Sequence, residues 1–295
     1  MNQEGIIMRI VYGLTFFSLA AIHLFAETGV ILPVESDKTE ERPESLEDWH
    51  FYLTSYYTPR TVTGDITRRN TEGFISTDLV ATGESLDLDK SNGLMYALGT
   101  QYKKWTLGFT YMPSRFEDQG NGFAFFDIED QKGDGVLTRV DTTAEVNINM
   151  YLANILYEVV HTPHTSLKVG IGAGASVVKF NITPQNHSIN EVVYDGSQPF
   201  GFVTINMANN YGDFLYSFNV NGVSMDQGDV HVNYSDYTVE LGYRFYHKKF
   251  NADIIGGYRM VNFALEGSNE TDNVNHKYDV DLTLKGPFIG ITLSY

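Results

Sequence analysis

Apolar and polar residues alternate with a period of two over much of this chain. The last stretch, Lys285–Tyr295, shows the pattern clearly. One of its sides is bulky and apolar and carries Ile289, Ile291, Leu293 and Tyr295. The other side is mostly small or hydroxylated and carries Phe288, Gly290, Thr292 and Ser294. Because successive side chains of a strand point to opposite faces, this stretch predicts a β-strand with one apolar face.

The same alternation recurs from Trp49 onward and predicts an all-β chain of about ten strands. The ten segments lie near residues 49–53, 93–102, 105–112, 144–159, 167–176, 200–207, 214–221, 237–246, 251–264 and 280–295. Eight and twelve strands are the alternatives, and twelve requires that Thr61–Arg68 also pairs.

Three features favour an antiparallel transmembrane β-barrel over a soluble sandwich. Several strands run to about ten residues or more, as a tilted membrane strand requires. Their polar faces carry Gly, Asn, Thr and isolated charges, which suits a hydrogen-bonded lumen. The connections also alternate in length, as expected of short periplasmic turns and long extracellular loops. The short connections are Lys103–Lys104, 161–166, 209–213 and 247–249, and the long ones are 59–92, 117–141, 183–199, 224–236 and 265–278.

The C-terminus resembles the assembly signal of Gram-negative outer-membrane barrels, in which a glycine and a hydrophobic residue precede a final aromatic. Gly290, Leu293 and Tyr295 match that spacing, whereas Phe288 stands where a polar residue is usual. We therefore interpret Phe288 as an aromatic that fills a narrow lumen. The resemblance is to the class of small outer-membrane barrels and identifies no single member. It implies contact with outer-membrane lipids and lipopolysaccharide, and insertion by the barrel-assembly machinery.

The N-terminus predicts secretion. Residues 6–25 are almost continuously apolar with Arg9 as their only charge, which is typical of a signal peptide. We place cleavage after Ala26, with Ala20 as the alternative, and translation could start at Met8 instead of Met1. An uncleaved anchor is the rival interpretation. The predicted organisation is a signal peptide at 1–26, a disordered acidic periplasmic lead at 27–48 and an outer-membrane barrel at 49–295.

Composition narrows the functional classes. The formal net charge is −17, with 37 acidic against 20 basic residues, which argues against nucleic-acid binding. Cys is absent, so disulfides and thiolate metal sites are excluded. We expect no cofactor. Divalent cations at acidic loops are an expected partner, and the candidate ligands are Asp127, Glu129, Asp130 and Asp134. The EF-hand pattern fails there because Lys132 stands where Gly is required.

Catalytic chemistry has one candidate segment, 224–236, which carries Asp226, Asp229 and His231. A carboxylate that orients an imidazole could support a surface hydrolase of the protease or lipid-modifying type. An ordinary solvated loop is the favoured interpretation. The glycines of the run GIGAGA at 170–175 are interpreted as small residues that pack against the lumen contents.

Charged residues on the predicted strands indicate what lines the lumen. Charges face lipid only at a cost of about 2–4 kcal/mol at the membrane midplane. They should therefore face inward and pair, and they are Lys168, Glu240, Arg244, Asp253 and Arg259. The segment 59–92 is long enough to fold into the lumen and could carry a short helix at 74–82. The predicted function is non-enzymatic, either envelope structure and surface binding or a narrow solute pore, with the surface hydrolase as the alternative.

Overall fold

A computed structural model shows an all-β barrel and describes residues 49–72, 75–82, 91–117, 122–129, 135–184, 191–247, 250–271 and 274–295. The first six strands are β1 (Trp49–Glu72), β2 (Ile75–Thr82), β3 (Ser91–Tyr102), β4 (Trp105–Glu117), β5 (Gly122–Glu129) and β6 (Gly135–His161). The others are β7 (Thr165–Pro184), β8 (Glu191–Tyr211), β9 (Phe214–Gln227), β10 (Val230–His247), β11 (Phe250–Thr271) and β12 (Val274–Ser294). Within the described ranges, no helix is long and apolar enough to cross a membrane.

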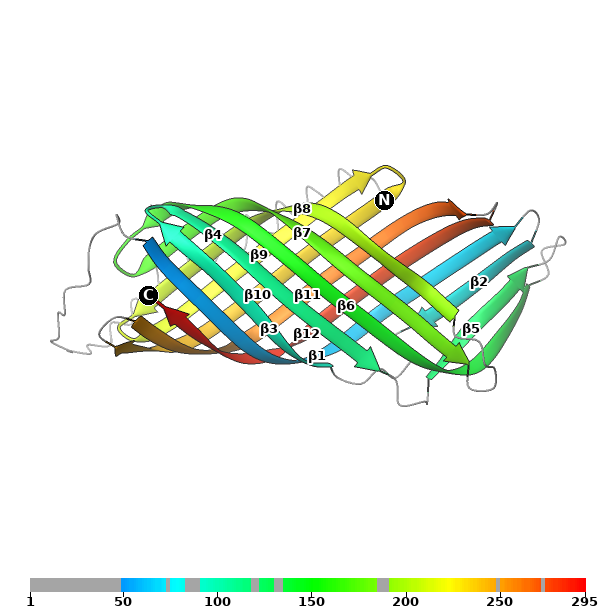
Figure 1. Cartoon of the computed structure of the whole chain (residues 1–295), viewed down its shortest axis with the longest axis horizontal. Helices are drawn as coiled ribbons and strands as arrows, with labels where there is room; N and C mark the ends of the chain where they lie inside the picture. The colour runs from blue at the N-terminus through cyan, green and yellow to red at the C-terminus, as the bar shows by residue number, and fades with distance from the viewer. Residues whose placement is uncertain are drawn as a thin grey trace, which may run out of the picture. The chain divides into compact units, whose positions relative to one another are not determined.

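The sheet closes because its last strand pairs with its first. β12 lies antiparallel to β1, and Phe51 and Tyr295 exchange both backbone hydrogen bonds at 2.9 Å. Every other strand pairing is antiparallel too. The first and last described residues therefore lie at the same end of the barrel, here named the terminal end, and the opposite end is named the distal end (Figure 1).

Twelve strands occupy ten positions around the barrel. Near the terminal end, β1 pairs with β3, and β4 pairs with β6. Towards the distal end, β1 pairs with β2 instead, β2 pairs with β5, and β5 pairs with β6. β2 and β5 thus continue the positions of β3 and β4, and Figure 1 shows them at the distal end. The predicted closed barrel with ten strand positions is confirmed.

Midway along β12, the apolar side chains change from the outer face of the barrel wall to its inner face. In the part nearest the C-terminus the outward side chains are Ile289, Ile291 and Leu293, all about half exposed. Further back along the strand the buried side chains are Val280, Leu282 and Leu284, while Asp279 and Asp281 are exposed. We name the two parts of the barrel the belt half and the distal half.

The belt half carries a continuous outward apolar surface that fits a bilayer. Its exposed side chains include Trp49, Phe51, Leu53, Leu94, Leu98, Trp105, Leu107, Ile171, Val203, Phe214, Leu241, Phe245, Ile254 and Tyr258. Residues 287–295, at about 3.3 Å each and a tilt of roughly 40°, span about 23 Å, close to the ~25 Å height of the apolar band of outer-membrane barrels.

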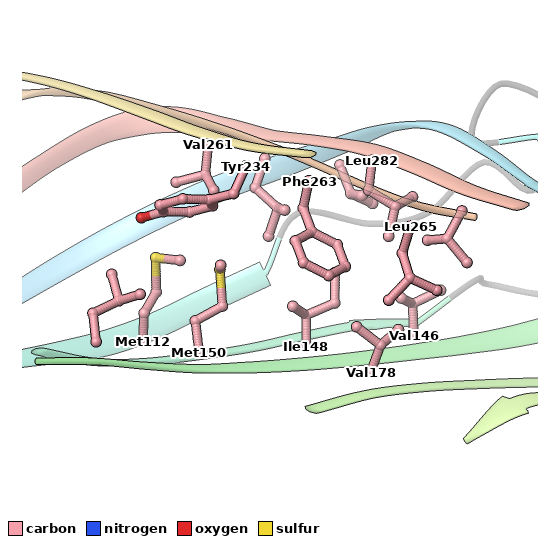
Figure 2. Close-up of a cluster of buried hydrophobic side chains, with 14 of the residues drawn as sticks. Met112, Val146, Ile148, Met150, Val178, Tyr234, Val261, Phe263, Leu265 and Leu282 are labelled. Carbon is pink, nitrogen blue, oxygen red and sulfur yellow. The ribbon is translucent and has the colours of Figure 1, made fainter. Parts of the chain in front are cut away.

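The distal half is filled by a hydrophobic core instead of water. Side chains from opposite walls meet across the lumen, with Phe263 of β11 pointing towards Ile148 of β6 in Figure 2. The rings of Phe200 and Tyr234 pack with centroids 4.8 Å apart. The other fully buried members include Met112, Phe116, Val146, Met150, Val178, Phe180, Val232, Val261, Leu265, Leu282 and Leu284.

Small residues also make room for apolar side chains inside the belt half. At Gly172 a Cβ atom would lie 2.2 Å from the ring of Phe202, and at Gly174 it would lie 2.6 Å from the ring of Phe200. The interpretation of the 170–175 glycines as packing positions agrees with these contacts. Phe288 is buried and meets Tyr56 edge to face at 5.2 Å, so it is the lumen-filling aromatic that the sequence predicts.

The segments expected as long outer loops are mostly strand. β1 continues through Glu72, and Ile75–Thr82 forms β2, so the expected lumen-plugging segment with a helix at 74–82 is wrong. Segment 224–236 is a hairpin with a two-residue turn, and 265–278 extends β11 and β12. Much of 117–141 and 183–199 also lies in strands. The physical reason is that these strands form a water-facing wall around the core, so their outward sides are polar like those of loops.

Candidate functional site

A cavity of about 520 Å³ lies in the distal half, near the turn between β9 and β10. We name it the rim cavity. Its lining comes from five strands and the β9–β10 turn and consists of Thr67, Asp226, Gly228, Asp229, Val230, His231, Glu266, Gly267, Ser268, Lys277, Tyr278 and Asp279. Three of these residues, Asp226, Asp229 and His231, are the catalytic candidates of the sequence. The structure brings them to one place.

Strand register arranges the polar groups of the rim cavity in one row. Asp226 is opposite His231, His231 is opposite Glu266, and Glu266 is opposite Asp279. Asp279 in turn is opposite Thr67 of β1. Cross-strand partners have Cβ atoms about 4.5–5.5 Å apart, so this row places an imidazole between two carboxylates.

The tight turn aligns the central pair. Gly228 has a φ of 63°, a left-handed conformation that glycine adopts without strain, and it lets β10 return directly alongside β9. Asp226 Oδ1 lies 2.6 Å from His231 Nδ1. With Nδ1 protonated, the imidazole donates to the carboxylate and its Nε2 is left as an acceptor. This is the arrangement of a general base, in which a carboxylate fixes the tautomer and the ring orientation.

Negative charge dominates the surface around the rim cavity. Partial burial of the Asp279 carboxyl raises its pKa, and the neighbouring carboxylates Glu266, Asp281 and Asp65 raise it further. Lys277 is the one lysine in the cavity lining. The row therefore favours cationic or hydrogen-bonding ligands over anionic ones.

A metal site finds no support in the part of the chain that the structure describes, where no three His, Asp or Glu side chains are grouped to hold an ion. Asp127 and Glu129 belong to β5, with side chains outside the described set. Asp130 and Asp134 lie outside the described residues altogether. The calcium candidates of the sequence stay a prediction.

The lumen charges predicted from the sequence lie inside the barrel. Arg244 donates from Nε and Nη2 to the two oxygens of Asp253, at 2.8 and 2.7 Å. Lys168 Nζ donates to Gln101 and Thr106 at 2.9 and 3.0 Å. Of the predicted five, Arg244 and Asp253 pair with each other.

Two further predicted lumen charges, Glu240 and Arg259, form hydrogen bonds with residues outside the predicted five. Glu240 accepts hydrogen bonds from Ser217 at 2.8 Å and from Tyr56 at 3.3 Å. Arg259 pairs with Asp236, which was not among the predicted charges. Hydroxyl groups and an unforeseen carboxylate thus complete the network.

Asp236 is the lumen residue that sequence reasoning missed. It is fully buried and accepts two hydrogen bonds from Arg259, from Nε at 2.9 Å and from Nη2 at 2.6 Å. It was missed because it ends a segment, 224–236, that was interpreted as a loop. The alternation Val232, Tyr234, Asp236, Thr238 was the available signal, since these four side chains are all buried.

The C-terminal residues lie as a closing strand requires. Gly290 is buried on the lumen side, where a Cβ atom would lie 2.7 Å from the Ser55 carbonyl oxygen. Leu293 and Tyr295 face outward and are about 47% and 70% exposed. Their role as an assembly signal stays a prediction.

Comparisons with known proteins show resemblance in the barrel fold. No family model matches the chain, and no curated protein matches it. Among solved structures, the outer-membrane protease OmpT of Escherichia coli aligns with a TM-score of 0.45 and 13% identity, over 83% of this chain and 97% of that one. Ail, the attachment invasion locus protein of Yersinia pestis, aligns with a TM-score of 0.30 and 10% identity, over 82% and 99%.

A FadL homologue of Pseudomonas aeruginosa aligns with a TM-score of 0.28 and 8% identity, over 84% of this chain and 90% of that one. These neighbours are Gram-negative outer-membrane barrels of different kinds. The structure itself confirms the barrel fold that the class predicted from the sequence, the small Gram-negative outer-membrane barrels, requires. The similarity to these neighbours extends no further than the fold.

Proposed function

We propose that this protein is a non-conducting outer-membrane barrel that presents its distal half, with the rim cavity, outside the cell as a binding surface. The observation that carries the proposal is the hydrophobic core that fills the lumen of the distal half. Any solute that crossed the barrel would have to pass between packed side chains such as Phe263 and Ile148. An ion would lose its hydration there without finding polar partners.

Placement in the membrane follows from the outward side chains. The belt half is apolar outside and suits lipid, whereas the distal half is polar outside and would leave charges such as Asp281 in hydrocarbon. At the terminal end the hairpins turn directly beside the belt, as at Lys103–Lys104, whereas the distal hairpins extend well beyond it. Outer-membrane barrels direct their short connections towards the periplasm and their long ones outwards. The distal half then projects beyond the lipid. Residues 274–286 of β12 supply it with roughly 30 Å of tilted wall.

Conductance in planar bilayers tests the closed lumen. We expect the folded full-length chain to insert and stay silent. The matched control replaces Phe263, Leu265 and Leu282 by alanine, which removes core volume while the belt stays unchanged. A steady conductance of the unaltered protein, with folded mobility on gels run without boiling, would overturn the proposal.

A second candidate function is a hydrolase at the rim cavity, and the 2.6 Å contact between Asp226 and His231 favours it. His231 Nε2 would accept a proton from an attacking water, and Asp226 would stabilise the imidazolium. Purified protein is incubated with peptide, phospholipid and lipid A substrates, beside His231→Asn and Asp226→Asn variants. Cleavage lost in both variants supports the enzyme, whereas equal product profiles in all three proteins exclude it.

A further inference from the structure

Two neighbouring strands of the distal wall separate before they end. β8 and β9 pair only as far as Val203 opposite Gly222. Beyond that point β8 continues beside β7, and β9 continues beside β10. Within the described residues, no strand pairs with β8 at 191–202 or with β9 at 223–227 on the sides that face each other. We name this stretch the open seam, and Figure 1 shows the distal ends of β8 and of the β9–β10 hairpin lying apart.

The β8 edge of the open seam carries backbone donors and acceptors. Antiparallel strands direct the N–H and C=O groups of alternate residues to opposite neighbours. The Asn210 amide donates to the His164 carbonyl beside β7 at 2.9 Å, and the register with β7 is continuous from there to Tyr194. Even-numbered residues of this stretch therefore face β7. Ser197 and Gly201 direct their N–H and C=O groups into the seam.

The residue types along this edge suit the approach of another backbone. Pro199 has no N–H group, and the missing donor is on the seam side, which is where a strand tolerates proline. A Cβ atom at Gly201 would meet the Gly172 carbonyl oxygen at 3.8 Å and no other described heavy atom within 4 Å. A Cβ atom at Gly222 would likewise meet only the Tyr234 carbonyl oxygen, at 3.7 Å. Both contacts are with the strands already paired, so the described residues leave the outer face of the seam open.

Aromatic rings close the seam on its inner side. Phe200 and Phe202 of β8 are buried, and their ring centroids lie 4.8 and 5.9 Å from that of Tyr234 on β10. The hydrophobic core is thus sealed without hydrogen bonds between β8 and β9. The β8 edge is not needed to close the lumen and stays available from outside.

We propose that the β8 edge binds an extended peptide segment of another protein, which adds to the distal wall as a strand antiparallel to β8. Backbone hydrogen bonds give strand addition its affinity. Ser197 and Gly201 each offer one donor and one acceptor, and Pro199 offers an acceptor. Such binding rests on the proposed function, because the outward placement of the distal half exposes the seam to proteins outside the cell.

A second copy of this chain fits the edge poorly. Antiparallel pairing of two β8 edges needs a two-fold axis perpendicular to the barrel wall. In the proposed placement that axis lies in the plane of the membrane and would turn one copy upside down. Two barrels in one membrane therefore cannot pair in this way, whereas a flexible peptide has no such constraint.

Peptide binding to the folded full-length chain in detergent tests the proposal. The probe is a fluorescently labelled peptide, Lys-Thr-Val-Thr-Val-Thr-Val-Lys, and its anisotropy measures affinity. We expect saturable binding that is lost when the threonine and valine amides are N-methylated. Ser197→Pro removes one seam donor and should weaken binding roughly 2- to 10-fold. Ser197→Ala keeps that donor and should bind as the wild type does.

Hydrogen exchange locates the contact without any variant. In the protein alone, the amides of Ser197 and Gly201 should exchange faster than those of Gln198 and Phe200, which face β7. Saturating peptide should slow the exchange of Ser197 and Gly201 by at least about tenfold and leave the other two unchanged.

Four results would overturn the proposal. One is the absence of saturable binding at up to about 1 mM peptide. The second is equal affinity of the N-methylated peptide, or of Ser197→Pro and the wild type. The third is slow exchange at Ser197 and Gly201 before peptide is added. The fourth is protection that develops only as the protein concentration rises, which means that a second copy covers the edge. None of these results alters the conductance of the barrel, so the closed lumen is tested separately.

Discussion

Asp281 and Leu282 are neighbours in β12 and face opposite sides of a wall that divides water from a hydrophobic core. Leu282 is 3% exposed inside the barrel, whereas Asp281 is exposed outside, opposite Asp65 of β1. This relationship is the reverse of the one in the belt half, where outward side chains are apolar. In the proposed placement, the membrane boundary lies between these two kinds of wall.

The membrane boundary predicts that an introduced arginine changes stability differently in the belt half and in the distal half. Leu241 is 66% exposed on the belt, and Leu241→Arg should destabilise the inserted barrel by about 2–4 kcal/mol, because arginine would face lipid. Asp281→Arg is the matched control and should change stability by less than about 1 kcal/mol. Urea unfolding in lipid vesicles measures both. Equal losses in the two variants would contradict the assigned boundary.

The lumen ion pair predicts a large effect of removing one partner. Arg259→Met should destabilise the barrel by about 3–5 kcal/mol, because Asp236 would be left charged and fully buried. Adding Asp236→Leu in the same chain should restore much of the loss, since no buried charge then remains. A double-mutant cycle by urea unfolding gives the coupling. Additive losses in the double variant would show that the two side chains do not act as a pair.

Core packing predicts a contrast between the inside and the outside of the barrel. Phe263 is 2% exposed, and Phe263→Ala should cost about 3–5 kcal/mol through the cavity that it leaves. Ile171, which is 64% exposed on the belt, is the matched site, and Ile171→Ala should cost much less because lipid fills the space. The same unfolding assay compares them. If Ile171→Ala were the more destabilising, the distal core would not be the main source of stability.

The acidic surface predicts a pH dependence. The pKa of Asp279 is raised in the folded protein by burial and by Glu266, so at neutral pH the ionised carboxylate opposes folding. Stability should rise as pH falls through this raised pKa towards the usual value of 3.8, because the folded state takes up the proton first. Asp279→Asn should therefore stabilise the protein at neutral pH, by no more than about 0.5 kcal/mol because solvent screens the charge of this largely exposed carboxyl.

The measurement compares the unfolding midpoints of wild type and Asp279→Asn from neutral pH down to about pH 4. Their difference should shrink as the medium becomes acidic. Asp281→Asn serves as a neighbouring control that removes one repulsive charge but leaves Asp279 able to titrate. A variant that is less stable than wild type at neutral pH would contradict the raised pKa.

The sequence predicted the belt half well because one physical rule governs it. Lipid demands an apolar outer face, so the alternation at Ile289, Ile291 and Leu293 could be recognised directly. Lumen-facing charges such as Arg244 followed from the same rule by elimination. The turn at Lys103–Lys104 was equally clear from its length. These features depend on neighbours in sequence and on the bilayer.

The distal half was predicted poorly because its outer face meets water. There Asp226, Asp229 and His231 lie among residues that are typical of loops, although the segment is a hairpin. The pairing of His231 with Asp226 and Glu266 depends on register across three strands, which alternation does not fix. The same is true of Asp236, whose partner Arg259 lies on the next strand.

β1 and β6 change their pairing partners part-way along their length, from β3 and β4 to β2 and β5. This change divides the barrel into a belt tier and a distal tier that need not evolve at the same rate. The belt tier closes through β3, β4 and the pairing of β1 with β12, and β2 and β5 take no part in it. Insertions and deletions in β2, β5 and their connections would change the outward tier while the membrane seal stayed intact. In the proposed placement, a lineage could thus diversify the distal surface without changing the strands that anchor the protein in the membrane.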